Sequence, residues 1–340
     1  MREIIDIPVL RFEGRSLEWR AVQGGDADKP AGAMRVAVVD IGTNSTRLLI
    51  ADVEGSEVRE VVRRTTVTNL GRGVSLTDRL CSDAIDGVCT VIGEYKALYE
   101  EMGAERVLAI ATSAVRDALN GEVFIAELRE RFDLDARMLT GEEEAHLTYL
   151  GATSARPNED ATLVFDIGGG STELIVGSGR DVAFHTSLQA GTIRQSERHL
   201  NSDPPDPHEL EDLADDVRHL IEDAIATSPE AAQGVHAIAV AGTPTSLAAI
   251  DQELDPYDPS RIHGYTLALR PIQHMLSRLS ALPLAERLRV TGLHPGRAPT
   301  IVAGAVILVQ VMRAFGIDEV EVSERDILHG SALSASLAPA

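Results

Sequence analysis

Lysine is nearly absent from this sequence, which has two, Lys29 and Lys96, among 31 basic residues. Neither follows a glycine-rich loop, so a Walker-type phosphate loop with its lysine is excluded. Cysteine is equally scarce. Cys81 and Cys89 lie eight residues apart on an expected helix, about 12 Å along its axis, which is too far for a disulfide. Two cysteines without a ligand spacing give no zinc site and are typical of a reducing cytoplasm.

Long hydrophobic runs are also missing. The longest, Ile301 to Met312, has 12 residues and contains Gln310, whereas a bilayer-spanning helix needs about 20. The chain does not open with a basic, then apolar, then small-residue pattern, so we expect no secretory signal. These absences predict a cytoplasmic protein without a membrane partner.

Positive charge is in short supply, with 53 acidic against 31 basic residues and a net charge of −22. Such a field repels nucleic acid, so a nucleic-acid partner is not expected. A small polyanionic substrate would need arginine concentrated in one cleft, for which Arg47, Arg72, Arg116 and Arg194 are candidates. With 340 residues, 44% of them hydrophobic, the chain has the length and composition of a two-domain globular protein.

An internal repeat organises the chain. DIGTNSTRLLI at 40–50 and DIGGGSTELIV at 166–176 lie 126 residues apart, and each reads as strand, small-residue turn and second strand. This predicts an α/β protein built from a duplicated domain. We expect a flexible extension at 1–33, one domain at 34–157 and a second at 158–340, whose last helix could pack back on the first. The boundary is placed in the polar segment 155–160.

Apolar patterning supplies the expected elements. Strands are predicted at 35–40, 46–53, 58–68, 106–112, 162–166, 173–177 and 235–241. Helices are predicted from Ser82, which would serve as the N-cap, within 114–131, from Thr140, and at 209–227, 271–282 and 299–314.

The two repeated turns are the main candidates for chemistry. In the first, Gly42 lets backbone amides approach an oxyanion, Thr43, Asn44 and Ser45 add neutral donors, and Asp40 would face a metal or water. A plain glycine hairpin is the alternative. The second turn has three consecutive glycines, more than a hairpin needs, which suggests close approach of a ligand. Asp166 and Glu173 flank it and could share one divalent cation.

Three further segments are weaker candidates. Gly242 and Thr243 follow an apolar run and precede a helix, as in an anion site or an ordinary strand-to-helix loop. Thr140 and Glu143 form a capping box that explains the glutamates of 142–144 structurally, although a catalytic carboxylate could be among them. Arg116 suits bidentate phosphate recognition, or it is a solvated helix residue.

Taken together, these motifs resemble the exopolyphosphatase and guanosine pentaphosphate phosphohydrolase family of the actin-like ATPase superfamily. DIGTNSTRLLI, ATSAVRDA, TGEEEA, DIGGGSTEL and AGTPTSLAAI occur in the family's order from Met34 onward. The resemblance implies two duplicated actin-like (ribonuclease H-like) domains with an interdomain cleft. It also implies Mg²⁺-dependent removal of the terminal phosphate from inorganic polyphosphate or from pppGpp.

Site roles follow from the resemblance by position. The catalytic glutamate falls on Glu144 and the phosphate-binding arginine on Arg116, while the metal-associated acids fall on Asp166 and Glu173, with Asp40 as a third candidate. The predicted phosphate-binding residues are Gly42, Thr43, Asn44, Ser45, Gly168, Gly169, Gly170, Ser171, Thr172, Gly242 and Thr243. Longer members append a helical domain that helps to hold long polymers, and this chain resembles the short two-domain form.

The expected mechanism is direct hydrolysis, with Glu144 deprotonating a water for in-line attack. Two other classes remain. An ATP-dependent phosphotransferase or ATPase on the same fold would need an adenosine pocket after Thr243, where apolar residues 247–250 favour helix packing instead. A non-enzymatic sensor of pppGpp or polyphosphate would have no need of a base. A homodimer is compatible with the sequence.

Overall fold

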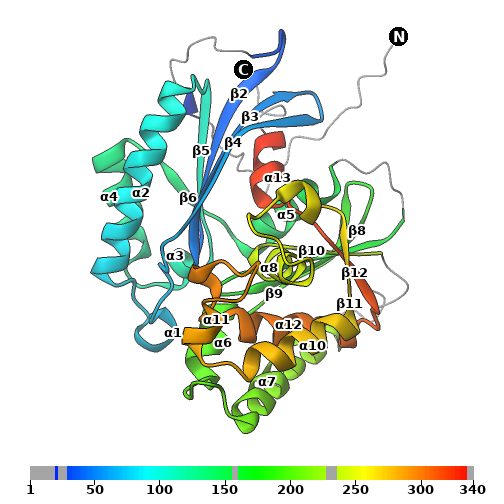
Figure 1. The fold of residues 1–340 in the computed structure, drawn as a ribbon. Helices are drawn as coiled ribbons and strands as arrows, with labels where there is room; N and C mark the ends of the chain where they lie inside the picture. The colour runs from blue at the N-terminus through cyan, green and yellow to red at the C-terminus, as the bar shows by residue number, and fades with distance from the viewer. Residues whose placement is uncertain (1–19, 22–28, 155–159, 227–235, 335–340) are drawn as a thin grey trace.

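The computed structural model describes residues 20–21, 29–154, 160–226 and 236–334, which form two six-stranded sheets with helices around them (Figure 1). The first sheet has the order β1-β5-β2-β3-β4, with β6 beside β5. The second has the order β11-β12-β10-β7-β8-β9. In each sheet an antiparallel three-stranded meander continues into two parallel strands, so the two halves share one topology.

Among its described residues, the first half contains the first of the repeated hairpins and five helices. Its strands are β1 (Arg20–Ala21), β2 (Met34–Ile41), β3 (Ser45–Glu54), β4 (Glu57–Val67), β5 (Arg106–Ala111) and β6 (Ala136–Met138). Its helices are α1 (Val74–Thr77), α2 (Ser82–Glu101), α3 (Ser113–Asp117), α4 (Gly121–Phe132) and α5 (Gly141–Thr153).

The second half repeats the plan with more helices. Its strands are β7 (Thr162–Ile167), β8 (Thr172–Ser178), β9 (Asp181–Leu188), β10 (His236–Val240), β11 (Tyr265–Ala268) and β12 (Glu319–Val322). Its helices are α6 (Thr192–His199), α7 (Pro207–Ala226), α8 (Gly242–Asp251), α9 (Pro259–Ile262), α10 (Leu269–Ser280), α11 (Leu284–Arg287), a 3₁₀ turn (Pro295–Arg297), α12 (Ile301–Ala314) and α13 (Ile327–Ser334).

The strand β2 is apolar at nearly every position because both of its faces are covered. Ala37 and Val39 pack with the helices α2 and α4 on one face. Val36 and Val38 pack with Leu328 of α13 on the other. A strand buried on both faces loses the alternation of a half-exposed strand, which explains the continuous run MRVAVVDI.

Two helices cross between the sheets. The helix α5 closes the first half of the chain but covers the second sheet, where Ala145 and Tyr149 pack against β7, β8 and β10. The helix α13 closes the second half and covers β2 and β3. At their crossing, a Cβ on Gly151 or Gly330 would overlap the backbone of the other helix, so the two backbones touch. Figure 1 shows α5 and α13 in the middle of the molecule.

Most expected strands and helices are confirmed within one to three residues. The expected cap at Ser82 is wrong: Cys81 is the N-cap, it makes no side-chain capping bond, and Ser82 is the first helical residue. The sequence analysis missed the strands β6, β9, β11 and β12 and the helices α1, α6, α9, α11 and α13. Of the predicted extension 1–33, Arg20 and Ala21 pair with β5, and most of the rest, like 155–159 of the predicted boundary, lies outside the described residues. Within the described part, no helix is long and apolar enough to cross a membrane.

Candidate active site

The two repeated turns lie against each other between the sheets. We call residues 42–45 loop I and residues 168–171 loop II. Both close in the same way: Gly42 N donates to Ser45 O, and Gly168 N donates to Ser171 O, each at 3.0 Å. A Cβ built on Gly169 would lie 3.0 Å from Asn44 N. The loops are therefore in direct contact, and the two halves of the chain meet at their duplicated hairpins.

The contact between the loops explains why loop II is rich in glycine, and the explanation differs from the expected one. A Cβ on Gly170 would overlap Ser113 Oγ and lie 3.0 Å from Thr43 Oγ1. Thr43 Oγ1 in turn accepts from the amide of Ala114. The sequence analysis attributed the glycine excess to a ligand, whereas the structure shows that side chains at 169 and 170 would first collide with the other domain.

Three consecutive backbone amides of loop II have no backbone hydrogen-bond partner among the described residues. Thr192 N and Ile193 N, at the start of α6, donate to Gly168 O and Gly169 O at 2.9 and 2.8 Å. Arg194 Nε donates to Gly170 O at 2.8 Å. In a trans peptide the N–H points opposite to the C=O, so the amides of 169, 170 and 171 face away from α6. None of the backbone hydrogen bonds found in the described loops uses these three as donors, and consecutive free amides bind anions.

Three acids are buried beside these amides. Asp166 and Glu173 face each other as a cross-strand pair of β7 and β8, and Glu144 lies nearby in α5. Burial raises the pKa of Asp166 to about 7 and that of Glu173 to about 7, and the charge of Asp166 adds to the second shift. Burial and the charge of Glu173 raise the pKa of Glu144 to about 8, against the opposing effect of Arg116. Perturbed, mutually repelling carboxyls in a pocket are typical of functional sites.

The start of α5 separates the three consecutive glutamates. Glu142 is exposed. Glu143 completes the capping box with Thr140, as predicted, and pairs with Arg137. Glu144 is buried and lines the pocket, and its Oε2 accepts from Arg116 Nη1 at 2.9 Å. Among the described residues, only Glu144 of this run lines the pocket, and Arg116, predicted to bind phosphate, does not line it but contacts the pocket through Glu144.

In the first hairpin, Asp40 is paired rather than free. Arg47 lies across from it on β3, and Arg47 Nε donates to Asp40 Oδ2 at 2.8 Å. Arg47 also pairs with Asp326 at the start of α13. Asp40 Oδ1 is buried without a hydrogen-bond partner within the described residues. Asp40 therefore keeps one oxygen for water or a metal.

The third predicted segment lies on the opposite wall. Gly242 and Thr243 are the first residues of α8 and line the pocket. A Cβ on Gly242 would overlap the guanidinium of Arg297, which therefore rests on this helix start. No hydrogen bond or ion pair of this guanidinium was found among the described residues, and it lines the same pocket. Sequence analysis missed Arg297, because a lone arginine in HPGR carries no motif.

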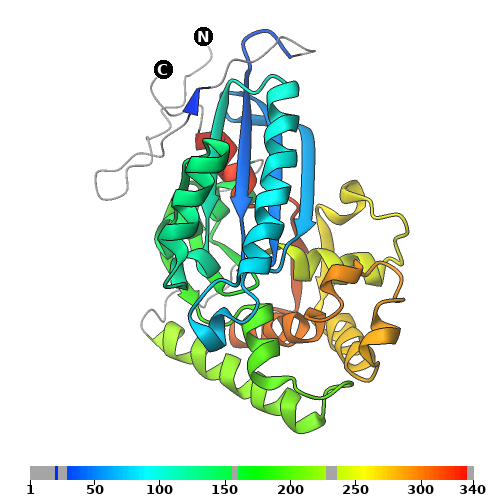
Figure 2. The same cartoon turned by 90° about the vertical axis from the view of Figure 1, so that its left-hand side faces the viewer.

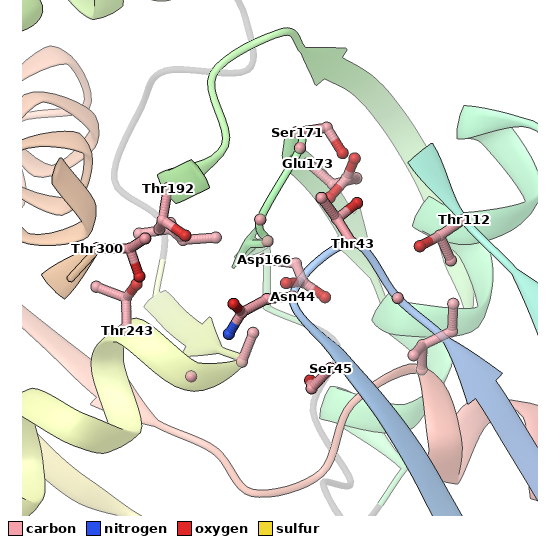
Figure 3. A pocket seen from close by; sticks show the side chains of 18 of the residues that line it. Thr43, Asn44, Ser45, Thr112, Asp166, Ser171, Glu173, Thr192, Thr243 and Thr300 are labelled. Atoms are coloured by element: carbon pink, nitrogen blue, oxygen red, sulfur yellow. The ribbon is translucent and has the colours of Figure 1, made fainter. Parts of the chain in front are cut away.

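These walls enclose a pocket of about 80 Å³, which Figure 3 shows from close by. Asp166 and Asn44 lie near the middle of the view, with Thr192, Thr243 and Thr300 on one side and Thr43 on the other. One prediction is wrong in detail: Thr172 does not line the pocket, since its hydroxyl donates to Ala190 O at 2.6 Å. Of the four candidate arginines only Arg47 lines the pocket, whereas Arg72, Arg116 and Arg194 lie outside it.

The side chains beside the pocket include oxygen ligands that a divalent cation prefers. Asp166 is buried and makes no side-chain hydrogen bond among the described residues, and Glu173 Oε1 is oriented by Ser187 Oγ at 2.8 Å. Within the described residues no three acidic, histidine or cysteine side chains form a cage on their own. Mg²⁺ is commonly held by one or two carboxylates together with substrate phosphates and water, so these residues fit it.

Comparison with known proteins shows which family the chain matches. Residues 48–338 match the model of the Ppx/GppA phosphatase family. The chain is 38% identical to exopolyphosphatase 2 of Mycobacterium tuberculosis over 315 residues, covering 88% of this chain and 98% of that protein. The crystal structure of the Aquifex aeolicus Ppx/GppA family member superposes with a TM-score of 0.75 at 32% identity, covering 90% of this chain and 98% of that one.

An exopolyphosphatase from Cytophaga hutchinsonii superposes with a TM-score of 0.80 at 26% identity, over 89% of this chain and 98% of that one. The family match and the aligned regions of these relatives cover most of the described residues. The α/β fold of two sheets with one topology is shared with these relatives along most of the chain. The chain therefore belongs to the Ppx/GppA phosphatase family, and it is a phosphoanhydride hydrolase.

Proposed function

We propose that this protein is an exopolyphosphatase that releases the terminal phosphate of inorganic polyphosphate by Mg²⁺-dependent attack of water. One observation carries the proposal: the buried acids Glu144, Asp166 and Glu173 lie beside three outward-facing amides of loop II, in a pocket of about 80 Å³. The pocket has room for one phosphate group, and the amides supply the hydrogen-bond donors that a phosphate needs, which the acids alone do not. The similarity to exopolyphosphatases supports the choice of substrate.

Each group in the pocket has a separate role in the proposed hydrolysis. Glu144 holds and deprotonates the attacking water, since its raised pKa lets it accept a proton near neutral pH. Arg116 orients the Glu144 carboxylate through its 2.9 Å hydrogen bond and, as substrate enters, can turn toward the phosphate oxygens. The amides of loops I and II hold the terminal phosphate from two domains, and the charge that develops on its oxygens is stabilised there.

Asp166 and Glu173 would hold the Mg²⁺, with Asp40 Oδ1 as a third oxygen at the edge of the site. The ion, when bound, neutralises charge on the phosphate oxygens and the leaving group. Asp166 and Glu173 would fix the position of the ion relative to the substrate, and the positive charge of the ion would relieve the repulsion between the two carboxylates. The proton from the attacking water stays with Glu144 until the phosphate leaves.

A second candidate substrate is pppGpp, and one feature favours it. A second pocket of about 650 Å³ adjoins the first and shares Arg47, Gly242 and Arg297 with it. Its walls combine apolar side chains such as Val67, Leu254 and Leu293 with the ring of Tyr257. A polyphosphate chain gains little from apolar walls, whereas a nucleoside would fill them.

The test is phosphate release from tripolyphosphate, longer polyphosphates, pppGpp and ATP in parallel, with and without Mg²⁺. The proposal expects release from polyphosphate that requires the metal. It also expects kcat/KM to level off after a few phosphate units, because the described residues offer phosphate contacts only around the cleft. Release from pppGpp alone would make the second candidate the function, and turnover of ATP alone would favour a different class.

Partners beyond the substrate stay predictions. The chain is expected to work in the cytoplasm without nucleic acid, and a homodimer could extend the phosphate track across two subunits. If kcat/KM keeps rising to long polymers, the mass in solution decides whether a dimer accounts for it.

A further inference from the structure

Arg194 connects the phosphate-holding loop to the other domain. It lies in α6, directly behind loop II, and its side chain is mostly buried. The amides of α6 fix the first two carbonyls of the loop, and Arg194 Nε fixes the third, Gly170 O, at 2.8 Å. The side chain therefore sets the orientation of the peptide between Gly170 and Ser171, and with it the last of the three outward-facing amides.

The same guanidinium reaches across the cleft. Arg194 Nη2 donates to Asp117 Oδ2 at 2.8 Å. Asp117 is the last residue of α3, in the first half of the chain, and its neighbour Arg116 donates to Glu144 and to Leu139 O, both at 2.9 Å. An unbroken series of polar contacts thus runs from loop II through Arg194 and Asp117 to the helix turn that carries Arg116.

A second contact from α6 supports the first. Glu197, three residues after Arg194, accepts from Gly73 N at 2.8 Å and from Ser75 Oγ at 2.6 Å. Both donors belong to the first half of the chain, at α1. One face of α6 therefore grips the opposite domain at two places, while Arg198 of the same helix pairs with Asp216 inside its own half. Figure 2 shows α6 directly below the first-half helices.

We propose that Arg194 is a positioning residue that couples loop II to the Arg116–Glu144 pair through Asp117, so that the phosphate grip and the catalytic base are aligned together when the two domains are closed. The inference rests on the proposed hydrolysis. Neither Arg194 nor Asp117 lines the phosphate pocket, so both act through other residues. Their loss should misalign the site rather than empty it, and misplacement of reacting groups by about 1 Å can reduce a rate by about 100-fold.

The test compares Arg194→Ala and Asp117→Asn with the matched control Arg198→Ala, which removes an exposed ion pair from the same helix. Phosphate release from tripolyphosphate at saturating Mg²⁺ gives kcat and KM. We expect Arg194→Ala to lower kcat about 10–100-fold with KM within about threefold, Asp117→Asn to lower kcat less, and Arg198→Ala to leave both unchanged. Arg194→Lys, which keeps the charge but can satisfy only one of the two acceptors well, should fall between wild type and Arg194→Ala.

Hydrogen exchange gives a readout that does not depend on activity. In Arg194→Ala, peptides covering loop II and α3 should exchange faster than in wild type, and in Arg198→Ala they should not. Wild-type kcat in Arg194→Ala, or equal losses in Arg194→Ala and Arg198→Ala, would overturn the inference. If the wild type hydrolyses none of the phosphoanhydrides, the proposed function fails, and unchanged exchange in Arg194→Ala would overturn the coupling separately. If Arg194→Ala does not fold, Asp117→Asn with its exchange at loop II decides.

Discussion

The two repeated hairpins have the same backbone arrangement, but the first pairs an acid with a base and the second pairs two acids. Asp40 and Asp166 occupy equivalent positions, 126 residues apart, and each faces a cross-strand partner seven residues later. In the first hairpin that partner is Arg47, which forms an ion pair with Asp40. In the second it is Glu173, so two buried carboxyls face each other. The difference between Arg47 and Glu173 at equivalent positions therefore decides whether the buried aspartate is neutralised or repelled by its cross-strand partner.

The cross-strand partner affects the pKa of the buried acid in each hairpin. Burial raises the pKa of Asp40, and Arg47 opposes that rise. In the second hairpin burial raises the pKa of Asp166 and of Glu173 to about 7 each, and the cross-strand partner of each is another acid. Buried like charges destabilise a fold unless a cation or a proton joins them. The comparison teaches that the duplicated frame was kept in both halves, while the chemistry is concentrated in the second.

The largest expected effect comes from the base beside the second hairpin. Glu144→Gln should lower turnover about 10²–10⁴-fold while the fold and substrate binding are kept, because the amide cannot accept the proton of the attacking water. The neighbouring Glu142→Gln is the matched control, since Glu142 is exposed and should leave kcat unchanged. Steady-state phosphate release measures both, and near-wild-type kcat in Glu144→Gln would remove it from the mechanism.

A second effect tests the contact between the hairpins. In Gly170→Ala the new methyl would overlap Ser113 Oγ, so loop II should shift and kcat should fall about 10-fold or more. Ser113→Ala removes the overlapping oxygen, and the double variant should recover most of the loss. If Gly170→Ala alone is as active as wild type, the loops do not need this close approach. Gly87→Ala is the control: it lies in α2, an added Cβ meets nothing within 4 Å, and kcat should stay unchanged.

The smallest effect is on stability. The pKa of Glu173 in the folded state lies above its ordinary value of 4.5, so its contribution to stability is fully present below about pH 4.5 and is lost as the pH rises from there through about 7. Glu173→Gln should therefore raise Tm by roughly 2–4 °C at about pH 8 and change it little at about pH 4. Thermal unfolding without metal measures this. Equal shifts at both pH values would show that the repulsion between Asp166 and Glu173 is not what the variant removes.

Local patterns predicted the parts of the site that lie within single segments. The repeated hairpins, the Thr140–Glu143 capping box and the helix after Gly242 all follow from nearest neighbours in the chain. The strands β11 and β12 have four residues each and the helix α6 has eight, so their patterns are too short to stand out in the sequence, and tertiary contacts stabilise them. The places of Arg194 and Arg297 depend on contacts with distant segments, such as Asp117 and Gly242, which no local pattern encodes. The choice of Glu144 among three glutamates came from the family resemblance, and burial supports it.

The most direct test of the comparison is the Mg²⁺ dependence of phosphate release in Asp166→Asn and in Asp40→Asn, the two equivalent acids. Asp166 makes no direct hydrogen bond or ion pair with its side chain within the described residues, and Arg47 offsets its charge only at longer range, whereas Asp40 is paired directly with Arg47. We expect Asp166→Asn to need about 10–100-fold more Mg²⁺ for half-maximal rate, and Asp40→Asn to need no more than about threefold more. Equal shifts in the two variants, or a larger shift in Asp40→Asn, would contradict the assignment of the chemistry to the second hairpin.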